Sequence, residues 1–398
     1  MGNELNLDVG VLPKELELLL LFMKCEGEEN IYSSHEELFI NMNWDVFLEL
    51  ARHHRVYPYI YNRVKGLDEQ WIPPYVIQEL SSEYRKNTFH MLHLTGETDQ
   101  ICQLLAGNEI QVIVLKGPTL ALDLYGDLSR RTCSDVDLLT PMENLNKVHE
   151  LLVKLDYVKE DYFSTIFNEW TWRHHHVTYF HSQKRIKLEI HWRLHPGPSW
   201  EPNFNELWSR KRTLSTTSHS IYILGREDLF LFLAAHGARH GWSRLRWLLD
   251  IDRMVLHNID WNKLNGLLKK YHFSQVAGQA LILSSQLLDT PLKKEMYTLT
   301  SGYRPKHLAQ EALFYIKQMV NLHSEPLPED VSRYHRRHLF SLMSNQQKAL
   351  FMFSLLYPYP IDAETLPLPR SIHFLYFPLR PFLCAWRKVR NLALHKGI

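Results

Sequence analysis

Two aspartates in alternate positions of a short apolar segment, Asp135-Val136-Asp137-Leu138-Leu139, restrict the fold of this 398-residue chain most strongly. The composition of the segment predicts a strand, and alternate side chains of a strand point to the same side. Asp135 and Asp137 therefore share one face, while Val136 and Leu138 point into a core. Two neighbouring carboxylates repel each other, and a hard divalent cation such as Mg²⁺ relieves that repulsion. The segment predicts a strand that binds metal.

A second segment, residues 187–193 (KLEIHWR), has a fully alternating pattern. Its even-numbered positions are apolar and its odd-numbered positions are polar. The polar residues are Lys187, Glu189, His191 and Arg193. If this strand pairs with the first one, Glu189 joins Asp135 and Asp137, and three carboxylates converge. Three carboxylates can hold two metal ions roughly 4 Å apart. These three residues are therefore the predicted metal ligands and catalytic residues.

A third feature is a strand that runs into a helix start at Leu115-Lys116-Gly117-Pro118-Thr119. Proline is favoured at the first helical position, after glycine. The free N–H groups of a helix start bind anions, which suits a triphosphate. Lys116 and, farther along the chain, Arg131 add positive charge, although Lys116 is also consistent with a solvated lysine at a strand end. The predicted nucleotide contacts here are Lys116, Gly117, Thr119 and Arg131.

The rest of the chain predicts helices on both sides of these strands. Residues 14–107 and 226–350 show mainly helical spacing, whereas the segment HPGPSW (195–200) marks a break. Strands are predicted at residues 112–115, 136–139, 177–180 and 186–194, with a helix at 143–155. We expect an N-terminal helical region (1–97), an α/β core (98–200) and a C-terminal helical region (201–398). The proline-rich part of the C-terminal region, residues 357–381, is predicted to run as an extended arm.

Composition excludes several classes of protein. The 45 basic and 44 acidic residues give a net charge of +1, which argues against a template-dependent polymerase or another dedicated nucleic-acid binder. No CxxC pair occurs among the four cysteines, so neither a disulfide framework nor a zinc knuckle is expected. These cysteines are Cys25, Cys102, Cys133 and Cys384. The N-terminus lacks a signal peptide, no apolar run is long enough to span a membrane, and a cytoplasmic location is expected.

Histidines offer further candidate ligands. His174, His175 and His176 are consecutive, so strand alternation argues against all three binding one ion, and a mixed surface-and-site role is expected. His236 and His240 share a helix face without the glutamate of an HExxH zinc motif. A packed or hydrogen-bonded pair is expected there, lining the cleft together with Arg239.

Several segments carry a resemblance to a known family. They are LKGPTLALDLYGD, Arg131, SDVDLL, EIHWRL and HGARHGWSRLRWLLDID, with ARHHRVYPYI before them and LRPF near the end. In these the chain resembles the polymerase-β-like nucleotidyltransferases and, more narrowly, a large bacterial family of uncharacterised nucleotidyltransferases. The resemblance implies an α/β (α+β) fold in which a small mixed sheet is flanked by helices. It also implies two Mg²⁺ ions and transfer of a nucleotidyl or related phosphoryl group from an NTP, expected to be ATP.

The resemblance also implies roles for individual residues. Asp135 and Asp137 correspond to the metal ligands, and Glu189 completes the triad and assists deprotonation of the acceptor. Lys116 and Gly117 stand where the superfamily has a turn of small residues. Further nucleotide contacts are expected from His191, His236, Arg239 and His240.

The acceptor is not readable from the sequence. The family resemblance suggests a small molecule, peptide or glycan carrying a hydroxyl or phosphate, in the synthesis of surface glycans or peptide natural products. The alternative is a non-catalytic nucleotide-binding scaffold or sensor with the same fold. The intact carboxylate triad argues against that alternative, because a decayed site usually loses a carboxylate first.

Overall fold

The computed structural model describes residues 7–395 except 11, 25–34, 68–69, 162, 164, 216–219, 323 and 325, with backbone only from residue 391. Expectations about Cys25 and the first six residues lie outside these described residues. Helices form the N-terminal part, as predicted, and the last of them is 34 residues long. They are α1 (Lys14–Lys24), η1 (Glu36–Leu38), α3 (Trp44–His53), α4 (Tyr57–Val64) and α5 (Pro74–Gly107).

The centre of the molecule is a seven-stranded mixed sheet with the order β3-β4-β5-β2-β1-β7-β6. Its strands are β1 (Ile113–Val114), β2 (Asp135–Leu139), β3 (Val158–Lys159), β4 (His176–His181), β5 (Ile186–His191), β6 (Arg212–Ser215) and β7 (Ser220–Ile223). β2 runs parallel to β5 and antiparallel to β1, while β4 and β5 form a hairpin. The predicted α/β class with a mixed sheet is confirmed.

The sheet extends past residue 200, where the sequence predicted the end of the α/β core. β7 pairs in parallel with β1 through Val114 and Ile223, and β6 pairs with β7. Ile221 and Ile223 of β7 are buried in the same core as Val136 and Leu188. The alternating pattern of β7 is only four residues long, and its partner strand β1 lies more than 100 residues earlier in the chain. The local sequence therefore did not predict this pairing.

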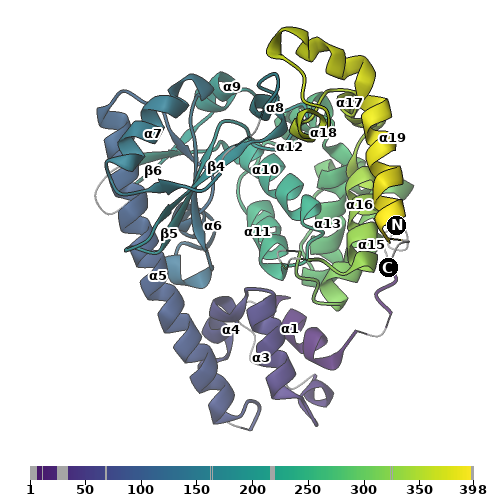
Figure 1. Cartoon of the computed structure of the whole chain (residues 1–398). Coiled ribbons are helices and arrows are strands. Elements are labelled where there is room, and N and C mark those ends of the chain that lie inside the picture. The colour runs from purple at the N-terminus through teal and green to yellow at the C-terminus, as the bar shows by residue number, and fades with distance from the viewer. Residues whose placement is uncertain are drawn as a thin grey trace.

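Each face of the sheet packs against different helices. Val136, Leu138 and Leu188 belong to a core shared with α5 and with α7 (Leu145–Val153), which follows η3 (Met142–Asn144). The alternate residues face the other way, and Leu139 belongs to a larger core shared with α10 (Arg226–Arg239). Figure 1 shows α5 running along the sheet and the α10 layer on the other side. The predicted polar face of β2 and β5 is therefore turned toward α10.

The remaining helices extend this layer and connect the strands. Between the strands lie α6 (Pro118–Tyr125), η2 (Leu128–Arg130), α8 (Trp170–Arg173) and α9 (Phe204–Ser209). After α10 come α11 (Leu245–Leu256), α12 (Trp261–Lys270), α13 (Ser274–Leu288), η4 (Lys294–Met296), α14 (Tyr297–Thr300), α15 (Tyr303–Lys317), α16 (Glu329–Leu342) and α17 (Asn345–Ser354). The helical spacing of residues 226–350 is thus confirmed.

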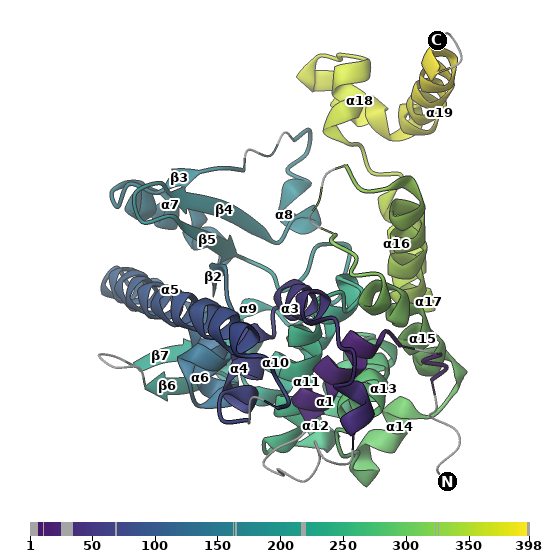
Figure 2. The ribbon, with the colours of Figure 1, turned by 90° about the horizontal axis from the view of Figure 1, so that it is seen from below.

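The predicted extended arm is wrong, because the proline-rich segment is mostly helical. It forms α18 (Pro360–Thr365), η5 (Arg370–Leu375) and the start of α19 (Tyr376–His395), which stand apart from the sheet in Figure 2. Pro360 and Pro378 lie in the first turns of their helices, where a backbone N–H has no hydrogen-bond partner within the helix, so that its absence in proline costs nothing. Only Pro381 lies inside a helix.

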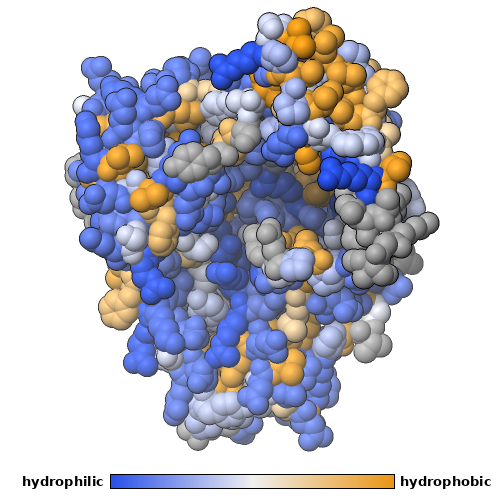
Figure 3. Space-filling view, viewed as in Figure 1, coloured by the Kyte–Doolittle hydropathy of each residue, from blue (hydrophilic) through white to orange (hydrophobic). Residues whose placement is uncertain are grey.

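Apolar side chains remain exposed on this C-terminal unit, at the upper right of Figure 3. They include Phe374, Phe382, Trp386 and Val389. Throughout the described ranges, every helix is too short or too polar to cross a membrane.

Candidate active site

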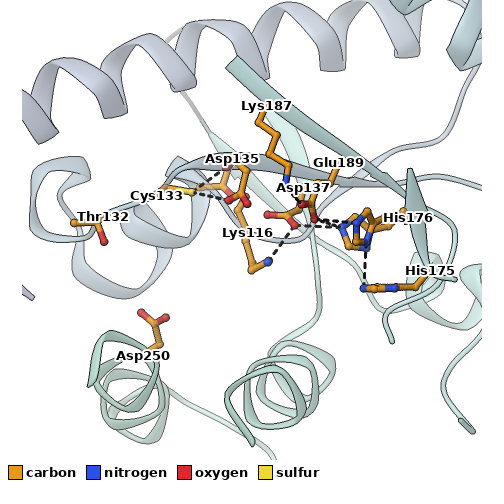
Figure 4. A network of polar contacts seen from close by, with 12 residues as sticks. Lys116, Thr132, Cys133, Asp135, Asp137, His175, His176, Lys187, Glu189 and Asp250 are labelled. Atoms are coloured by element: carbon orange, nitrogen blue, oxygen red, sulfur yellow. Dashed lines mark hydrogen bonds and ion pairs between the residues drawn. The ribbon is translucent and has the colours of Figure 1, made fainter. Parts of the chain in front are cut away.

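Strand register brings the predicted carboxylates onto one face. β2 and β5 are neighbours, with Asp137 opposite Glu189 and Asp135 opposite Lys187. On the far side of β5, His176 of β4 lies opposite His191. Figure 4 shows the polar side chains of the three strands gathered on one side of the sheet. The two strands therefore pair, and Glu189 lies on the same face as Asp135, which is the condition on which the prediction of a carboxylate triad depended.

Asp137 is the centre of this polar face. Its Oδ1 lies 3.1 Å from Lys116 Nζ and 3.2 Å from His191 Nε2. Glu189 lies 3.4 Å from the same His191 nitrogen and receives a 2.7 Å hydrogen bond from Lys187. Potential ligand atoms of Asp137, Glu189 and His191 all lie within 4.8 Å of one another. Asp135 shares the face, but its carboxylate lies outside this group of three.

The three grouped residues fit a cation. Asp137 is completely buried, and its Oδ2 has no hydrogen-bond partner among the described residues. A buried carboxylate oxygen without a donor is costly, and a metal ion is one ligand that satisfies it. Carboxylate and imidazole donors together suit divalent ions from Mg²⁺ to the first-row transition metals.

Charges within the site oppose the effect of burial. Burial disfavours the charged form of Lys116, but Asp137, Asp135 and Glu189 outweigh it and raise the lysine pKa. Burial likewise works against ionised Asp137, yet Lys116 and His191 hold the pKa of Asp137 below its ordinary value. The Asp137 charge is therefore favourable in the folded protein even without metal.

Asp135 behaves in the opposite way. Burial and the neighbouring charge of Asp137 raise the pKa of Asp135. Its carboxylate Oδ1 is contacted by the Cys133 thiol at 3.7 Å, a weak donor. Asp135 is thus the carboxylate of the triad with the least compensation for its charge.

A glycine turn places the start of α6 beside β2. Gly117 has φ 96° and ψ −153°, a conformation that a side chain would strain. A Cβ at this position would lie 3.7 Å from the backbone oxygen of Asp135. The buried Thr119 hydroxyl donates to the Lys116 carbonyl at 3.3 Å and so closes the turn. Pro118 begins the helix, as the sequence predicted.

Comparison with known proteins agrees with this geometry. The sequence profile of a family described as uncharacterised nucleotidyltransferase matches residues 41–289, which include the whole sheet. The chain belongs to this family. The match ends directly after α13, so α14 to α19 lie beyond it.

Other comparisons add little to the assignment. No match was found among curated proteins. A crystal structure of an antigenic nucleotidyltransferase-like protein from Paracoccidioides brasiliensis has 17% sequence identity to this nucleotidyltransferase. The similarity covers 50% of this chain and 94% of that chain, with a TM-score of 0.31.

The phosphate contact predicted for Arg131 is not supported by the nucleotidyltransferase structure. Arg131 is 3% exposed, and its Nε and Nη2 donate to the two oxygens of Asp250, each at 2.9 Å. Nη1 donates to the Thr132 carbonyl at 3.2 Å. The guanidinium is therefore committed to an internal ion pair, whose other member lies 119 residues farther along the chain.

Helix α10 forms the opposite wall of the site. The ring of Phe232 lies 5.8 Å from Lys116 Nζ. Burial and the positive charge of Lys116 lower the pKa of His236. His236 and His240 pack together with ring centroids 4.6 Å apart, as predicted, and both contact Trp247.

Arg239 differs from Arg131. Burial lowers the pKa of Arg239 to about 10, against the opposing charges of Glu189 and Glu201. Within the described parts of the chain its guanidinium makes no hydrogen bond or ion pair. It also lines a pocket of about 220 Å³, whose walls include Phe273 and Leu342. Arg239 is thus a cation near the carboxylates that is open to an anionic ligand.

The structure also brings together residues to which the sequence gave no definite role. Lys187 neutralises Glu189, a contact that the alternation of β5 could have indicated. His175 Nε2 lies 3.2 Å from His176 Nδ1. His174 does not join them, because its ring stacks on Phe163. Strand alternation does not decide the direction of the His175 side chain, because β4 begins only at His176.

Proposed function

We propose that this nucleotidyltransferase uses Mg²⁺ to transfer a nucleotidyl group from an NTP, expected to be ATP, to a hydroxyl or phosphate of an acceptor. The observation that carries the proposal is the buried Oδ2 of Asp137, which has no hydrogen-bond partner in the described part of the chain and lies beside Glu189 and His191. The proposed acceptor is a small molecule, a peptide or a glycan, as the family resemblance suggests. The proposed location of the protein is the cytoplasm.

Asp137, Glu189 and Asp135 would hold the metal ions. Bound Mg²⁺ supplies positive charge that offsets charge developing on the pyrophosphate leaving group. His191 bridges the first two carboxylates through Nε2 and keeps them oriented. Burial of Asp137 and Glu189 excludes water from one side of the site.

Two cations and a helix start are available for the phosphates. Lys116 contacts Asp137 of β2, and Arg239 belongs to α10, the helix that packs on this side of the sheet. A triphosphate between them would receive donors from both walls, in addition to the free N–H groups at the start of α6. Lys116 would then exchange its contact with Asp137 for one with a phosphate oxygen.

The transfer forms one bond and breaks another. The acceptor oxygen attacks the α-phosphorus, and the bond from that phosphorus to the bridging oxygen of the β-phosphate breaks, which releases pyrophosphate. The proton of an acceptor hydroxyl passes to a carboxylate. We assign this role to Asp135, because among the described residues its Oδ1 is contacted only by the Cys133 thiol, a weak donor, whereas Glu189 accepts a hydrogen bond from Lys187.

The test compares two labels of the same nucleotide. The protein is incubated with Mg²⁺, cell extract and either α-³²P or γ-³²P NTP, and labelled products are separated. Nucleotidyl transfer predicts label in a new product from the α-labelled nucleotide only. Label from the γ position would indicate phosphoryl transfer, and no new product with any of the four NTPs would count against enzymatic transfer.

A specific contact favours a second candidate, the nucleotide-binding scaffold. Lys116 already supplies a counter-charge to Asp137, so the site has a stable arrangement without metal. A scaffold of this kind would bind NTP equally well with and without Mg²⁺ and release no pyrophosphate. Equilibrium binding in the presence of EDTA separates the two candidates.

A further inference from the structure

Three histidines form a compact group at the β4 end of the polar face. Potential ligand nitrogens of His175, His176 and His191 all lie within 4.8 Å of one another. The ring centroids are 4.4 Å apart for His175 and His176, 4.9 Å for His176 and His191, and 5.4 Å for His175 and His191. Figure 4 shows His175 and His176 at the edge of the carboxylate network.

Backbone pairing fixes the three side chains. His176 is opposite His191 in the β4–β5 ladder, so their side chains share a face. The His175 carbonyl accepts a 3.0 Å hydrogen bond from the backbone N–H of Trp192, the residue after His191. The sheet therefore fixes His176 and His191, and the hydrogen bond from Trp192 ties His175, which precedes β4, to the residue that follows β5.

The spacing is that of a metal site. Zinc binds histidine nitrogen at about 2.0–2.1 Å in a tetrahedron, which places ligand nitrogens roughly 3.4 Å apart. His175 Nε2 and His176 Nδ1 are already 3.2 Å apart. Small side-chain rotations would bring the third imidazole to the same separation, because 4.8 Å is the largest distance to be closed.

A second observation points independently to a ligand. His191 is 3% exposed, and its Nδ1 has no hydrogen-bond partner within the described residues. Its Nε2 is occupied by Asp137 and Glu189. Buried ring nitrogens without a partner are costly, whereas metal-bound histidines characteristically contact a carboxylate through the other nitrogen.

We propose that His175, His176 and His191 bind one first-row transition ion of the Zn²⁺ type, next to the carboxylate site. Imidazoles prefer such ions, whereas Mg²⁺ prefers oxygen ligands, so a site of three histidines favours a transition ion over Mg²⁺. Glu189 Oε2, which is 3.8 Å from His176 Nε2, lies beside the cluster and links it to the carboxylates. The ion would hold His191 in place and thereby fix its contacts with Asp137 and Glu189.

Metal content tests this proposal without any measurement of transfer activity. The full-length protein is loaded with Zn²⁺, dialysed against excess Mg²⁺, and analysed for zinc. The wild type is expected to retain one Zn²⁺ per chain. His175→Ala and His176→Ala should each weaken Zn²⁺ binding by about tenfold or more. His174→Ala is the matched control and should bind Zn²⁺ like the wild type, because His174 stacks on Phe163.

Cobalt spectroscopy of the wild type gives a result that does not depend on whether the variants fold. Co²⁺ should produce the intense visible absorption of a four-coordinate site, and Zn²⁺ but not Mg²⁺ should displace it. The proposal is overturned if the wild type retains no zinc, if Co²⁺ shows only a weak octahedral spectrum, or if folded His175→Ala and His176→Ala variants bind Zn²⁺ like His174→Ala.

Discussion

Two buried charged clusters of the molecule differ in how completely their polar atoms are paired. In the first, Arg131 and Asp250 form a bidentate pair, and the Tyr125 hydroxyl donates to Asp250 at 2.8 Å. Every oxygen and nitrogen of that ion pair has a partner. In the second, Asp137 Oδ2 and His191 Nδ1 have no partner within the described chain.

Burial and charge alone therefore do not identify a site. Both clusters contain a fully buried aspartate and a cation, but only the one on β2 and β5 leaves polar atoms unsatisfied. A satisfied cluster orients the fold, whereas an unsatisfied cluster of carboxylates and imidazole keeps ligand atoms for a cation. We call them the closed cluster (Tyr125, Arg131, Asp250) and the open cluster (Lys116, Asp135, Asp137, Glu189, His191).

The largest expected effect comes from breaking the closed cluster. Asp250→Ala leaves Arg131 as an unpaired buried charge and should lower the free energy of unfolding by about 3–5 kcal/mol. Chemical denaturation measures this loss. The double variant Arg131→Met/Asp250→Leu should recover most of it, because no buried charge remains. A loss below about 1 kcal/mol for Asp250→Ala would show that the Arg131–Asp250 pair contributes no more to stability than a surface ion pair, which would contradict the structural role of the closed cluster.

The open cluster should instead respond to ligand. Adding Mg²⁺ at a hundred times its Kd should stabilise the folded protein by about 2.7 kcal/mol, seen as a higher Tm. Asp137→Asn should abolish this increase, while the exposed Asp330→Asn control should keep it. An equal increase in Asp137→Asn would place the stabilising ion elsewhere.

Within the open cluster, substitution of the two aspartates by asparagine should change the free energy of unfolding in opposite directions. Asp135→Asn removes a charge that burial and Asp137 disfavour, so it should raise stability at pH 7 in the absence of metal. Asp137→Asn removes a charge that Lys116 stabilises against burial, so it should lower stability. Both changes should stay below about 2 kcal/mol. Denaturation in EDTA measures them, and changes of the same sign would contradict the proposed role of Lys116.

The smallest effect is a pH dependence of stability that comes from His53 and His54, two histidines outside both clusters. Burial and Arg244 lower the pKa of His53 from 6.5 to about 4, and burial lowers that of its neighbour His54. The unfolded chain therefore takes up protons first as the pH falls. Their stabilising contribution is complete above pH 6.5 and declines toward pH 4, by less than about 1 kcal/mol for partly exposed His53.

The pH dependence can be assigned by substitution. The denaturation midpoint should fall between pH 7.5 and 5.5, and His53→Gln should reduce that fall. A midpoint that rises as the pH is lowered through this range would contradict the assignment.

The sequence predicted local features better than distant partners. Alternation in residues 135–139 and 187–193 located β2, β5 and their polar faces, because a strand's side-chain direction is set by its own backbone. It could not show that these strands pair, since parallel neighbours can be joined across long connections. The pairing was a condition of the prediction, and the sheet met it.

The same limit explains the errors. Arg131 looked like a phosphate ligand because its partner Asp250 lies 119 residues away. The C-terminal prolines suggested an extended arm because proline at a helix start cannot be distinguished locally from proline in a loop.

One measurement tests the central claim most directly: that the unsatisfied cluster on β2 and β5 is where a nucleotide reacts. The rate of transfer from α-³²P NTP in the presence of Mg²⁺ and cell extract is compared for the wild type, Asp137→Asn and Asp330→Asn, all shown to be folded. We expect Asp137→Asn to reduce the rate at least about a hundredfold and Asp330→Asn to match the wild type. Folded Asp137→Asn protein that transfers label at the wild-type rate would contradict the account.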